Sequence, residues 1–424
     1  MIYSIIAIIL VIASILLVTF NVLKSKWYAW LIYFASLFTA YSTTMIGFSV
    51  VGSDISRELL MSNLALQNGW DLSIYDPSNT SGVVGCFVPF LCQIVNGFYI
   101  LGYAIFAFPN YDPPLSILGV EWFYKIVLPM IFAFAPVMLY FIFKKQFGEL
   151  KAFYALMFFI IVPVFSLEVA TIGKSMVAET LMVLTLWVMF TDWKQIYKFL
   201  VMVVLVVLTL WAHYTIGILL CIYLAGISVL TTAYKARDSK KWWEFGWGFW
   251  SLLGVVTIGA MFFGGYYMNV AQGLIWDSSM GIFHHDFSSS FQAIQMSVTD
   301  TYDLSSNVSY TAKAYILVKS ALGLDLLSYS WSGIAFRVVQ LLTQVLVVIG
   351  FVWMLWKQKL YNLKSEYVAG CFVAFGLLGL CVFVPAFASL INATREYHIA
   401  LMFLASCFVV AFDGIGNIRN WRRK

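Results

Sequence analysis

Long stretches without Asp, Glu, Lys or Arg recur along the chain. They cover residues 1–23, 27–53, 126–143, 152–167, 180–191, 199–234, 245–276, 338–356, 367–394 and 397–412. Most approach or exceed the ~20 residues that a helix needs to cross a hydrocarbon core of ~30 Å. Because lipid offers backbone polar groups no partner, a spanning segment satisfies them within its own helix. The pattern therefore predicts a polytopic transmembrane helical bundle of the all-α class.

The pattern predicts about eleven spans. Their expected positions are 2–21, 27–51, 119–143, 152–168, 175–191, 197–212, 214–234, 246–269, 334–356, 367–390 and 397–416. The run 199–234 would form about 54 Å of helix at 1.5 Å per residue, which is too long for one crossing. We therefore expect two short spans there, with His213 at the turn between them.

Composition agrees with this pattern. The 424 residues are 62% hydrophobic and 11% charged, with a mean hydropathy of +0.89, whereas an ordinary soluble domain carries roughly 25% charged residues. We expect one integral-membrane domain over 1–424, multi-pass in the cell membrane and in contact with the bilayer.

Basic residues predict the orientation. When the spans are assigned alternately to two faces, 18 of the 25 Lys and Arg residues fall on one face. Cytoplasmic loops carry the excess of basic residues, so this face is predicted to be cytoplasmic, with the N-terminus outside and the C-terminus inside. The net charge of +5 is then a topology signal, and we expect no nucleic-acid partner.

Two long external regions follow from this topology, at 52–118 and 270–332. Within the first, 83–108 is apolar and uncharged and resembles a further span. A crossing there would invert every later basic cluster. We therefore expect interfacial helices in this region, broken near Pro89 and Gly97.

The first external region opens with "GSDISRE", residues 52–58. Asp54 and Glu58 are four residues apart and would share one face of a helix. At the first turn, Asp54 also meets the positive end of the helix dipole, which favours the ionised form of its carboxyl group. The alternative is that these carboxylates only pair with Arg57 or Lys174 at an exposed helix start.

A membrane chain with an acid directly after a span, a second acid and then "NGWD" resembles the GT-C superfamily of glycosyltransferases. The segments "GSDISRELLMSNLALQNGWD", "LPMIFAFAPVMLYFIFKKQFG" and "AHYTIGIL" are similar to archaeal membrane proteins placed near that superfamily. The resemblance covers about residues 45–235. It implies a hexosyltransferase that takes a polyprenyl-phosphate sugar, such as a dolichyl-phosphate sugar, as donor. The acceptor would be a glycan, protein or lipid on the external face, and Asp54 would be the catalytic base with Glu58 as its support.

Such a transfer requires only a few charged residues at the active site. A lipid phosphate leaves as a stable anion, so the reaction needs a base for the acceptor hydroxyl and cations for the departing charge. The candidates for donor-phosphate binding are Arg395, Lys174 and Arg57, whereas Tyr397, two residues after Arg395, is a candidate for the acceptor site or cavity. Arg395 could instead be an interfacial side chain that reaches toward water.

Other ionisable residues could line an acceptor site or cavity. Glu168 and Glu179 flank the turn that carries Lys174, and His213 lies at the predicted external turn. An ionisable residue within a span is costly and suggests a cavity or a partner. No pattern of metal ligands is visible, because the adjacent histidines of "HHD", 284–286, point in different directions. We expect no cofactor and no metal.

Two further classes stay open. A transporter or flippase for lipid-linked saccharides or another solute would carry charges at mid-membrane and paired broken helices. In this chain the charges gather at one interface, which favours surface chemistry. A membrane scaffold without activity is the third class.

Overall fold

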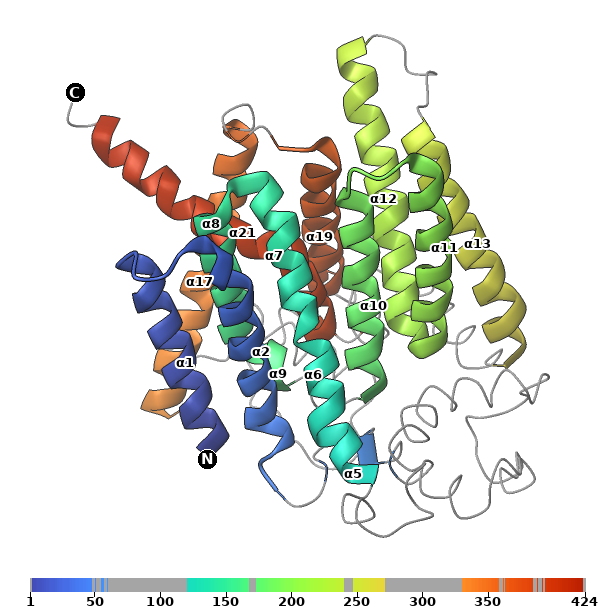
Figure 1. Ribbon diagram of the computed structural model, residues 1–424. Coiled ribbons are helices and arrows are strands. Elements are labelled where there is room, and N and C mark those ends of the chain that lie inside the picture. The colour runs from blue at the N-terminus through green and yellow to red at the C-terminus, as the bar shows by residue number, and fades with distance from the viewer. Residues whose placement is uncertain are drawn as a thin grey trace, which may run out of the picture. The chain divides into compact units, whose positions relative to one another are not determined.

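The computed structural model describes residues 2–47, 50, 55, 56, 59, 120–167, 173–239, 247–270, 330–357, 361, 363–383, 387, 391 and 393–421. All regular structure in these residues is helical (Figure 1). The predicted all-α class is therefore confirmed for the described part of the chain. Two compact units can be distinguished and are treated separately: unit 1 comprises Met1–Ile142 and Phe159–Gln272, and unit 2 comprises Phe143–Phe158 and Gly273–Lys424.

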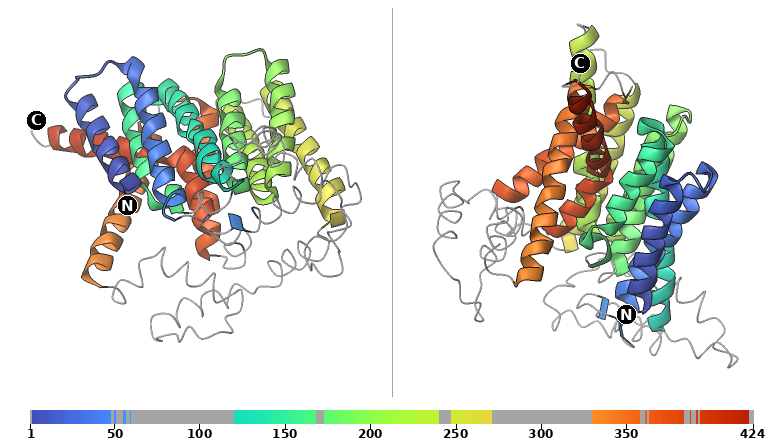
Figure 2. Two further views of the ribbon diagram at one scale, coloured as in Figure 1. Left: turned by 60° about the horizontal axis from the view of Figure 1, so that its bottom comes forward. Right: turned by 90° about the vertical axis from the view of Figure 1, so that its left-hand side faces the viewer.

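Unit 1 contains most of the helices. They are α1 (Ile2–Thr19), α2 (Tyr28–Thr44), α5 (Val120–Trp122), a π-helical segment (Phe123–Val127), α6 (Leu128–Phe132), α7 (Phe134–Phe147) as far as Ile142, α9 (Pro163–Leu167), α10 (Gly173–Phe190), α11 (Gln195–Ala212), α12 (Tyr214–Ser239) and α13 (Trp247–Val270). Helices α1 and α2 pack side by side, and α2 also packs against α6 and α9 (Figures 1 and 2). A cluster of Tyr33, Leu37, Tyr41 and Ala133 forms the core between α2 and the break after α6.

Helices α10 to α13 form the second part of unit 1. Helix α11 packs against α10, α12 and α13, and α12 also packs against α10 and α13 (Figure 1). Small residues permit the close approach of α11 and α13, since a Cβ atom at Gly259 would lie 2.9 Å from Cγ1 of Val206. Because short links join α10 to α11 and α11 to α12, these three helices run in alternating directions.

Unit 2 consists of the end of α7, most of α8 (Glu149–Ile161), α17 (Trp331–Trp356), α19 (Ser365–Phe383) and α21 (Ala393–Trp421). Helix α21 packs against both α17 and α19. At Gly350 of α17 the two backbones meet, because a Cβ atom there would lie 1.7 Å from the carbonyl oxygen of Cys407. Gly148, with φ +83°, makes the left-handed turn between α7 and α8.

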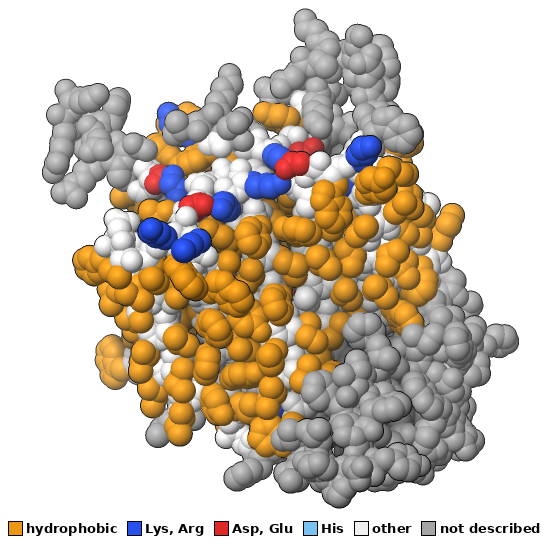
Figure 3. Space-filling view, viewed as in Figure 1, with side chains coloured by type: hydrophobic (Ala, Val, Ile, Leu, Met, Phe, Trp, Pro, Cys, Tyr) orange, Lys and Arg blue, Asp and Glu red, His pale blue; other side chains and the backbone are white. Residues whose placement is uncertain are grey.

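Eight helices of the described chain are long and apolar enough to cross a membrane. They are Ile2–Thr19, Phe123–Phe147, Gly173–Phe190, Gln195–Ala212, Tyr214–Tyr234, Trp331–Trp356, Ser365–Phe383 and Thr394–Ile415. Hydrophobic side chains cover the sides of the helices in the face shown in Figure 3. A polytopic membrane protein is thus supported, whereas the number of eleven spans and the orientation stay predictions.

The three remaining predicted spans correspond to shorter apolar helices. Helix α2 has 17 residues, and the apolar stretch within α13 is Gly248–Phe263. The expected span 152–168 is interrupted, because α8 ends at Ile161 and α9 begins at Pro163. Proline has no backbone N–H and disfavours helical geometry in the residue before it, which explains the break at Val162.

Each unit has a lysine-rich end. In unit 1 this end carries Lys24 and Lys26 between α1 and α2, and Lys194 and Lys198 at the start of α11. In unit 2 it carries the lysines that flank the α7–α8 turn and those that lie between α17 and α19, which are Lys144, Lys145, Lys151, Lys357 and Lys364. This distribution within each unit is the one expected of cytoplasmic ends.

Candidate functional site

Four of the predicted site residues lie outside the described residues: Asp54, Arg57, Glu58 and Glu168. Three of their neighbours are described and helical. Ile55 is 2% exposed, Leu59 is partly buried, and Ser56 is exposed. This is the pattern expected if Ile55 and Leu59, which are four residues apart, lie on one apolar side of a helix. The next described residues are 120–167.

Helix α10 carries two of the predicted residues in unit 1. Lys174 is its second residue and is partly buried, and Glu179 is completely buried. Glu179 lies six residues after Gly173, about 9 Å along the helix at 1.5 Å per residue. A buried carboxyl group at this depth is costly in lipid, so it indicates a polar environment inside the protein.

His213 forms the link between α11 and α12, as predicted. Its backbone is extended, with φ −156° and ψ 107°, so it ends α11, and its carbonyl oxygen accepts a bond from Gly217 N at 3.0 Å in the next helix. The side chain is 6% exposed and its ring stacks on Tyr214 at 5.7 Å. The start of α10 and the α11–α12 link lie at the same end of unit 1 because α10, α11 and α12 alternate in direction (Figure 1).

Lys125 is a residue of this end that the sequence reasoning did not select. It lies in the π-helical segment, is 3% exposed, and its Nζ donates a hydrogen bond to the carbonyl oxygen of Gly47 at 2.5 Å. Pro129, four residues later, has no N–H to give to the Lys125 carbonyl. The Thr44 hydroxyl donates to that carbonyl instead, at 3.1 Å. The sequence feature that could have identified Lys125 was a lysine at the end of a predicted span, four residues before Pro129.

Helix α2 holds the rest of this irregular backbone in the same way. The hydroxyl of Tyr41 donates to the carbonyl oxygen of Ile126 at 3.3 Å, and that of Tyr33 to Met130 at 3.4 Å. Because the partners run in opposite order, α2 and the segment 125–130 are antiparallel. The end of α2 and Lys125 therefore share one end of unit 1, which we call the Lys125 end. The start of α10, which carries Lys174, and the α11–α12 link, which contains His213, lie at the same end of the unit (Figure 1).

In unit 2, the predicted residues Arg395 and Tyr397 lie in the first turns of α21. Arg395 is 7% exposed, and two further ionisable residues beside it, Glu396 and His398, are completely buried. Arg395 and Lys174 belong to different units, so their joint role in binding one phosphate stays a prediction.

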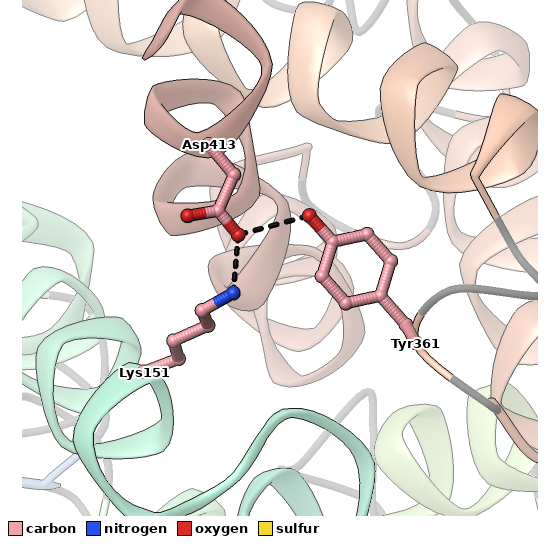
Figure 4. A network of polar contacts seen from close by, with 3 residues as sticks. All are labelled: Lys151, Tyr361 and Asp413. Carbon is pink, nitrogen blue, oxygen red and sulfur yellow. Dashed lines mark hydrogen bonds and ion pairs between the residues drawn. The ribbon is translucent and has the colours of Figure 1, made fainter. Parts of the chain in front are cut away.

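A network of polar contacts occupies the lysine-rich end of unit 2 (Figure 4). Lys151 of α8 and the hydroxyl of Tyr361 both contact one carboxylate oxygen of Asp413 in α21, the hydroxyl at 2.9 Å. The Lys151 Nζ also lies 5.0 Å from the centroid of the Tyr361 ring. Burial and the Asp413 carboxylate raise the pKa of Tyr361. This network links α8, α21 and the segment between α17 and α19 that contains Tyr361, so its role is to hold these segments of unit 2 together.

Metal binding finds no support in the described residues. Within the ranges that the structure covers, no three His, Cys, Asp or Glu side chains are grouped so as to hold a metal ion. The described ionisable groups at the Lys125 end include the ammonium groups of Lys125 and Lys174, the carboxyl groups of Glu121 and Glu179 and the imidazole of His213. Such a set can bind an anion and exchange protons.

Comparisons with known proteins place the chain in a family. Residues 198–421, more than half of the chain, match the family model described as predicted membrane protein (DUF2206). No curated protein and no solved structure matches the chain. The matched region includes α12, α13 and all the helices of unit 2 that follow Gly273. The chain therefore belongs to the DUF2206 family of predicted membrane proteins.

Proposed function

We propose that this protein is a membrane glycosyltransferase. It moves a sugar from a polyprenyl-phosphate carrier to an acceptor on the external face, with inversion at the anomeric carbon. The observation that carries the proposal is the burial of Lys125, Glu179 and His213 near one end of unit 1, the end opposite the lysine-rich one. Ionisable groups that are costly to bury thus occur at the end of unit 1 where the chain leaves α2 and re-enters at α5.

Each predicted residue has a role in this reaction. The acceptor hydroxyl oxygen attacks the anomeric carbon while the bond from that carbon to the phosphate oxygen breaks. Asp54 takes the hydroxyl proton with Glu58 as its support, and the lipid phosphate leaves with the bonding electrons. The residues that would balance the phosphate charge are the cations Arg395, Lys174 and Arg57. The residues that would line the acceptor site are His213, Glu168, Glu179 and Tyr397.

The arrangement of charges favours this proposal over transport. A transport pathway needs polar groups at the middle of the membrane, at broken helices. The buried groups of α10 and of the π-helical segment instead lie within about 10 Å of the helix ends, at 1.5 Å per residue. The resemblance of residues 45–235 to the GT-C superfamily adds further support.

Sugar transfer can be measured directly. Purified protein in nanodiscs receives a radiolabelled polyprenyl-phosphate sugar together with glycan, protein or lipid acceptors, each in a separate reaction. Loss of a general base typically costs 100-fold or more, so we expect Asp54→Asn to transfer label at least about 100 times more slowly. Asp192→Asn, which changes an exposed acid at the lysine-rich end of unit 1, is the matched control and should retain wild-type rates.

Two results would contradict the mechanism. Equal transfer by wild type and Asp54→Asn would remove Asp54 as the base. Label that crosses the membrane but is never transferred would favour the transporter. Alkaline phosphatase fused after residue 241 or after residue 300 tests the orientation, because we expect an active enzyme only for the second fusion.

A further inference from the structure

The link between α1 and α2 carries two exposed lysines beside exposed aromatic side chains. Lys24 precedes the 3₁₀ helix Ser25–Trp27 and Lys26 lies within it, and both lysine side chains are exposed. The Nζ of Lys26 lies 5.7 Å from the centroid of the Trp27 ring. A cation–π contact uses the face of the ring, so N–H groups of the ammonium can still donate to another acceptor.

This part of unit 1 has a local excess of positive charge. Residues 1–53 contain no Asp or Glu, and Lys24 and Lys26 are their only Lys or Arg residues. Helix α2 packs against α1, α6, α9, the 3₁₀ helix and the π-helical segment, and none of these elements contains an acidic residue. Because α1 is long and apolar enough to cross a membrane, its end places both lysines at the membrane surface. The link is therefore complementary to an anionic headgroup.

An exposed aromatic strip adjoins the two lysines. It consists of Trp27, Trp30 and Phe34, which are 48%, 57% and 44% exposed and lie on one face because their spacings are three and four residues. The rings of Trp30 and Phe34 stack with their centroids 6.3 Å apart. The Tyr33 ring makes edge contacts with both and lies 4.7 Å from the Phe134 ring of α7. Packing against unit 1 therefore holds the aromatic strip in place.

The position and charge of this surface favour a lipid over a protein partner. From Trp27 to Phe34 the aromatic strip extends about 10 Å along α2, at 1.5 Å per residue, from the membrane surface into the hydrocarbon region. A soluble acidic protein would reach the lysines but not Phe34. A second copy of this chain, bound through a two-fold axis at the strip, would bring two pairs of lysines together, and like charges in contact are unfavourable. An acidic phospholipid supplies both an anionic phosphate and an acyl chain.

We propose that the start of α2 binds an acidic phospholipid. Lys24 and Lys26 bind the phosphate of its headgroup, and the aromatic strip packs against one of its acyl chains. This interaction surface goes beyond the proposed function and does not depend on sugar transfer. Each lysine near a membrane surface contributes about fivefold to the attraction of an acidic lipid, so the pair should favour it about 25-fold over a zwitterionic lipid.

Photocrosslinking to lipid measures this preference at the aromatic strip. The full chain, with p-benzoylphenylalanine in place of Phe34, is reconstituted into nanodiscs of equimolar phosphatidylglycerol and phosphatidylcholine with identical acyl chains. Intact mass spectrometry then gives the ratio of the two lipid adducts. We expect about 25 to 1 with both lysines present, about 5 to 1 in Lys24→Gln or Lys26→Gln, and about 1 to 1 in the double variant. Salt at about 1 M, where the Debye length is about 3 Å, should also lower the first ratio.

Two controls separate the local charges from the net charge of the protein. Lys144 is the matched lysine, because its Nζ lies 2.6 Å from Oε1 of Glu149 and its side chain is 41% exposed. Lys144→Gln should therefore leave the ratio at position 34 unchanged. Ile5, 48% exposed, lies near the start of α1, and this is the opposite end of the helix pair because a short link makes α1 and α2 antiparallel. The photoreactive residue in place of Ile5 should form both adducts equally.

Each outcome decides the proposal. Equal adducts at position 34 with both lysines present would overturn it, and this result needs no lysine variant. The same preference in the double variant, or at position 5, would overturn it because the preference would not come from Lys24 and Lys26. Adducts with a second copy or with another protein would make the aromatic strip a protein contact and contradict the proposal. Inorganic phosphate that abolishes the preference, where chloride of equal ionic strength does not, would identify free phosphate as the ligand and likewise overturn it.

Discussion

The contact between α17 and α21 gives the sharpest prediction of stability. A Cβ atom at Gly350 would lie 1.7 Å from the carbonyl oxygen of Cys407 and 3.0 Å from the backbone nitrogen of Ala411. Both neighbours are backbone atoms of a helix and cannot rotate away. Gly350→Ala therefore requires α17 and α21 to move apart until the first distance reaches about 3 Å, near the lower limit of van der Waals contact.

The magnitude follows from two opposing terms. Overpacking of a well-packed interior typically costs about 1–3 kcal/mol. Replacing glycine by alanine within a helix gains about 1 kcal/mol from helix propensity where the new methyl group has space. Gly376 of α19 offers that space, since no atom lies within 4 Å of the position that a methyl group would take there. Because the propensity gain is common to both helical positions, we expect Gly350→Ala to be less stable than Gly376→Ala by about 1–3 kcal/mol.

Equilibrium unfolding in mixed micelles with increasing SDS measures this difference. The free energy of unfolding should fall in Gly350→Ala and stay the same or rise in Gly376→Ala, both relative to wild type. Equal stability of the two variants would show that the backbones of α17 and α21 do not meet at Gly350. The reasoning about this interface would then be refuted.

Three further predictions concern polar contacts. Asp413→Asn weakens the contact with Lys151, and because both side chains are about one-third exposed, we expect a loss of about 1 kcal/mol in the same unfolding assay. The folded chain keeps the Tyr361 proton after tyrosines of the unfolded chain begin to ionise near pH 10, so the free energy of unfolding should fall above about pH 10. Tyr361→Phe should reduce that fall, and an unchanged pH dependence would contradict it. Thr44→Val leaves the Lys125 carbonyl without its hydroxyl donor, and a cost of about 1–3 kcal/mol is expected, with Thr257→Val, on an exposed position of α13, as control.

The hairpin at 199–234 shows what charge-free runs can predict. Its length exceeds one crossing, and the structure has α11 and α12 there, with His213 between them. The reasoning needed only the rise of a helix per residue and the thickness of a bilayer.

Lys125 and the break at Val162 could not be located in this way. Pro163 lies within an uncharged run, and hydropathy does not register the missing N–H of a proline. The hydrogen bonds of Lys125 join it to Thr44 of α2 and to Gly47, about 80 residues earlier in the chain, as the separation of the bonded residues shows. A pattern confined to neighbouring residues contains no information about such a partner.

The π-helical segment also affects how related sequences should be compared. Relative to a regular α-helix, it acts like one inserted residue, and each residue of an α-helix turns the chain by about 100°. Side chains before Phe123 are therefore rotated by roughly this angle from the positions that the later part of the helix would assign to them. Deletion of one residue between 123 and 127 would restore a continuous helix and carry Trp122 and Glu121 to another side. A relative that lacks this residue should accordingly present different groups at the same end of its first unit.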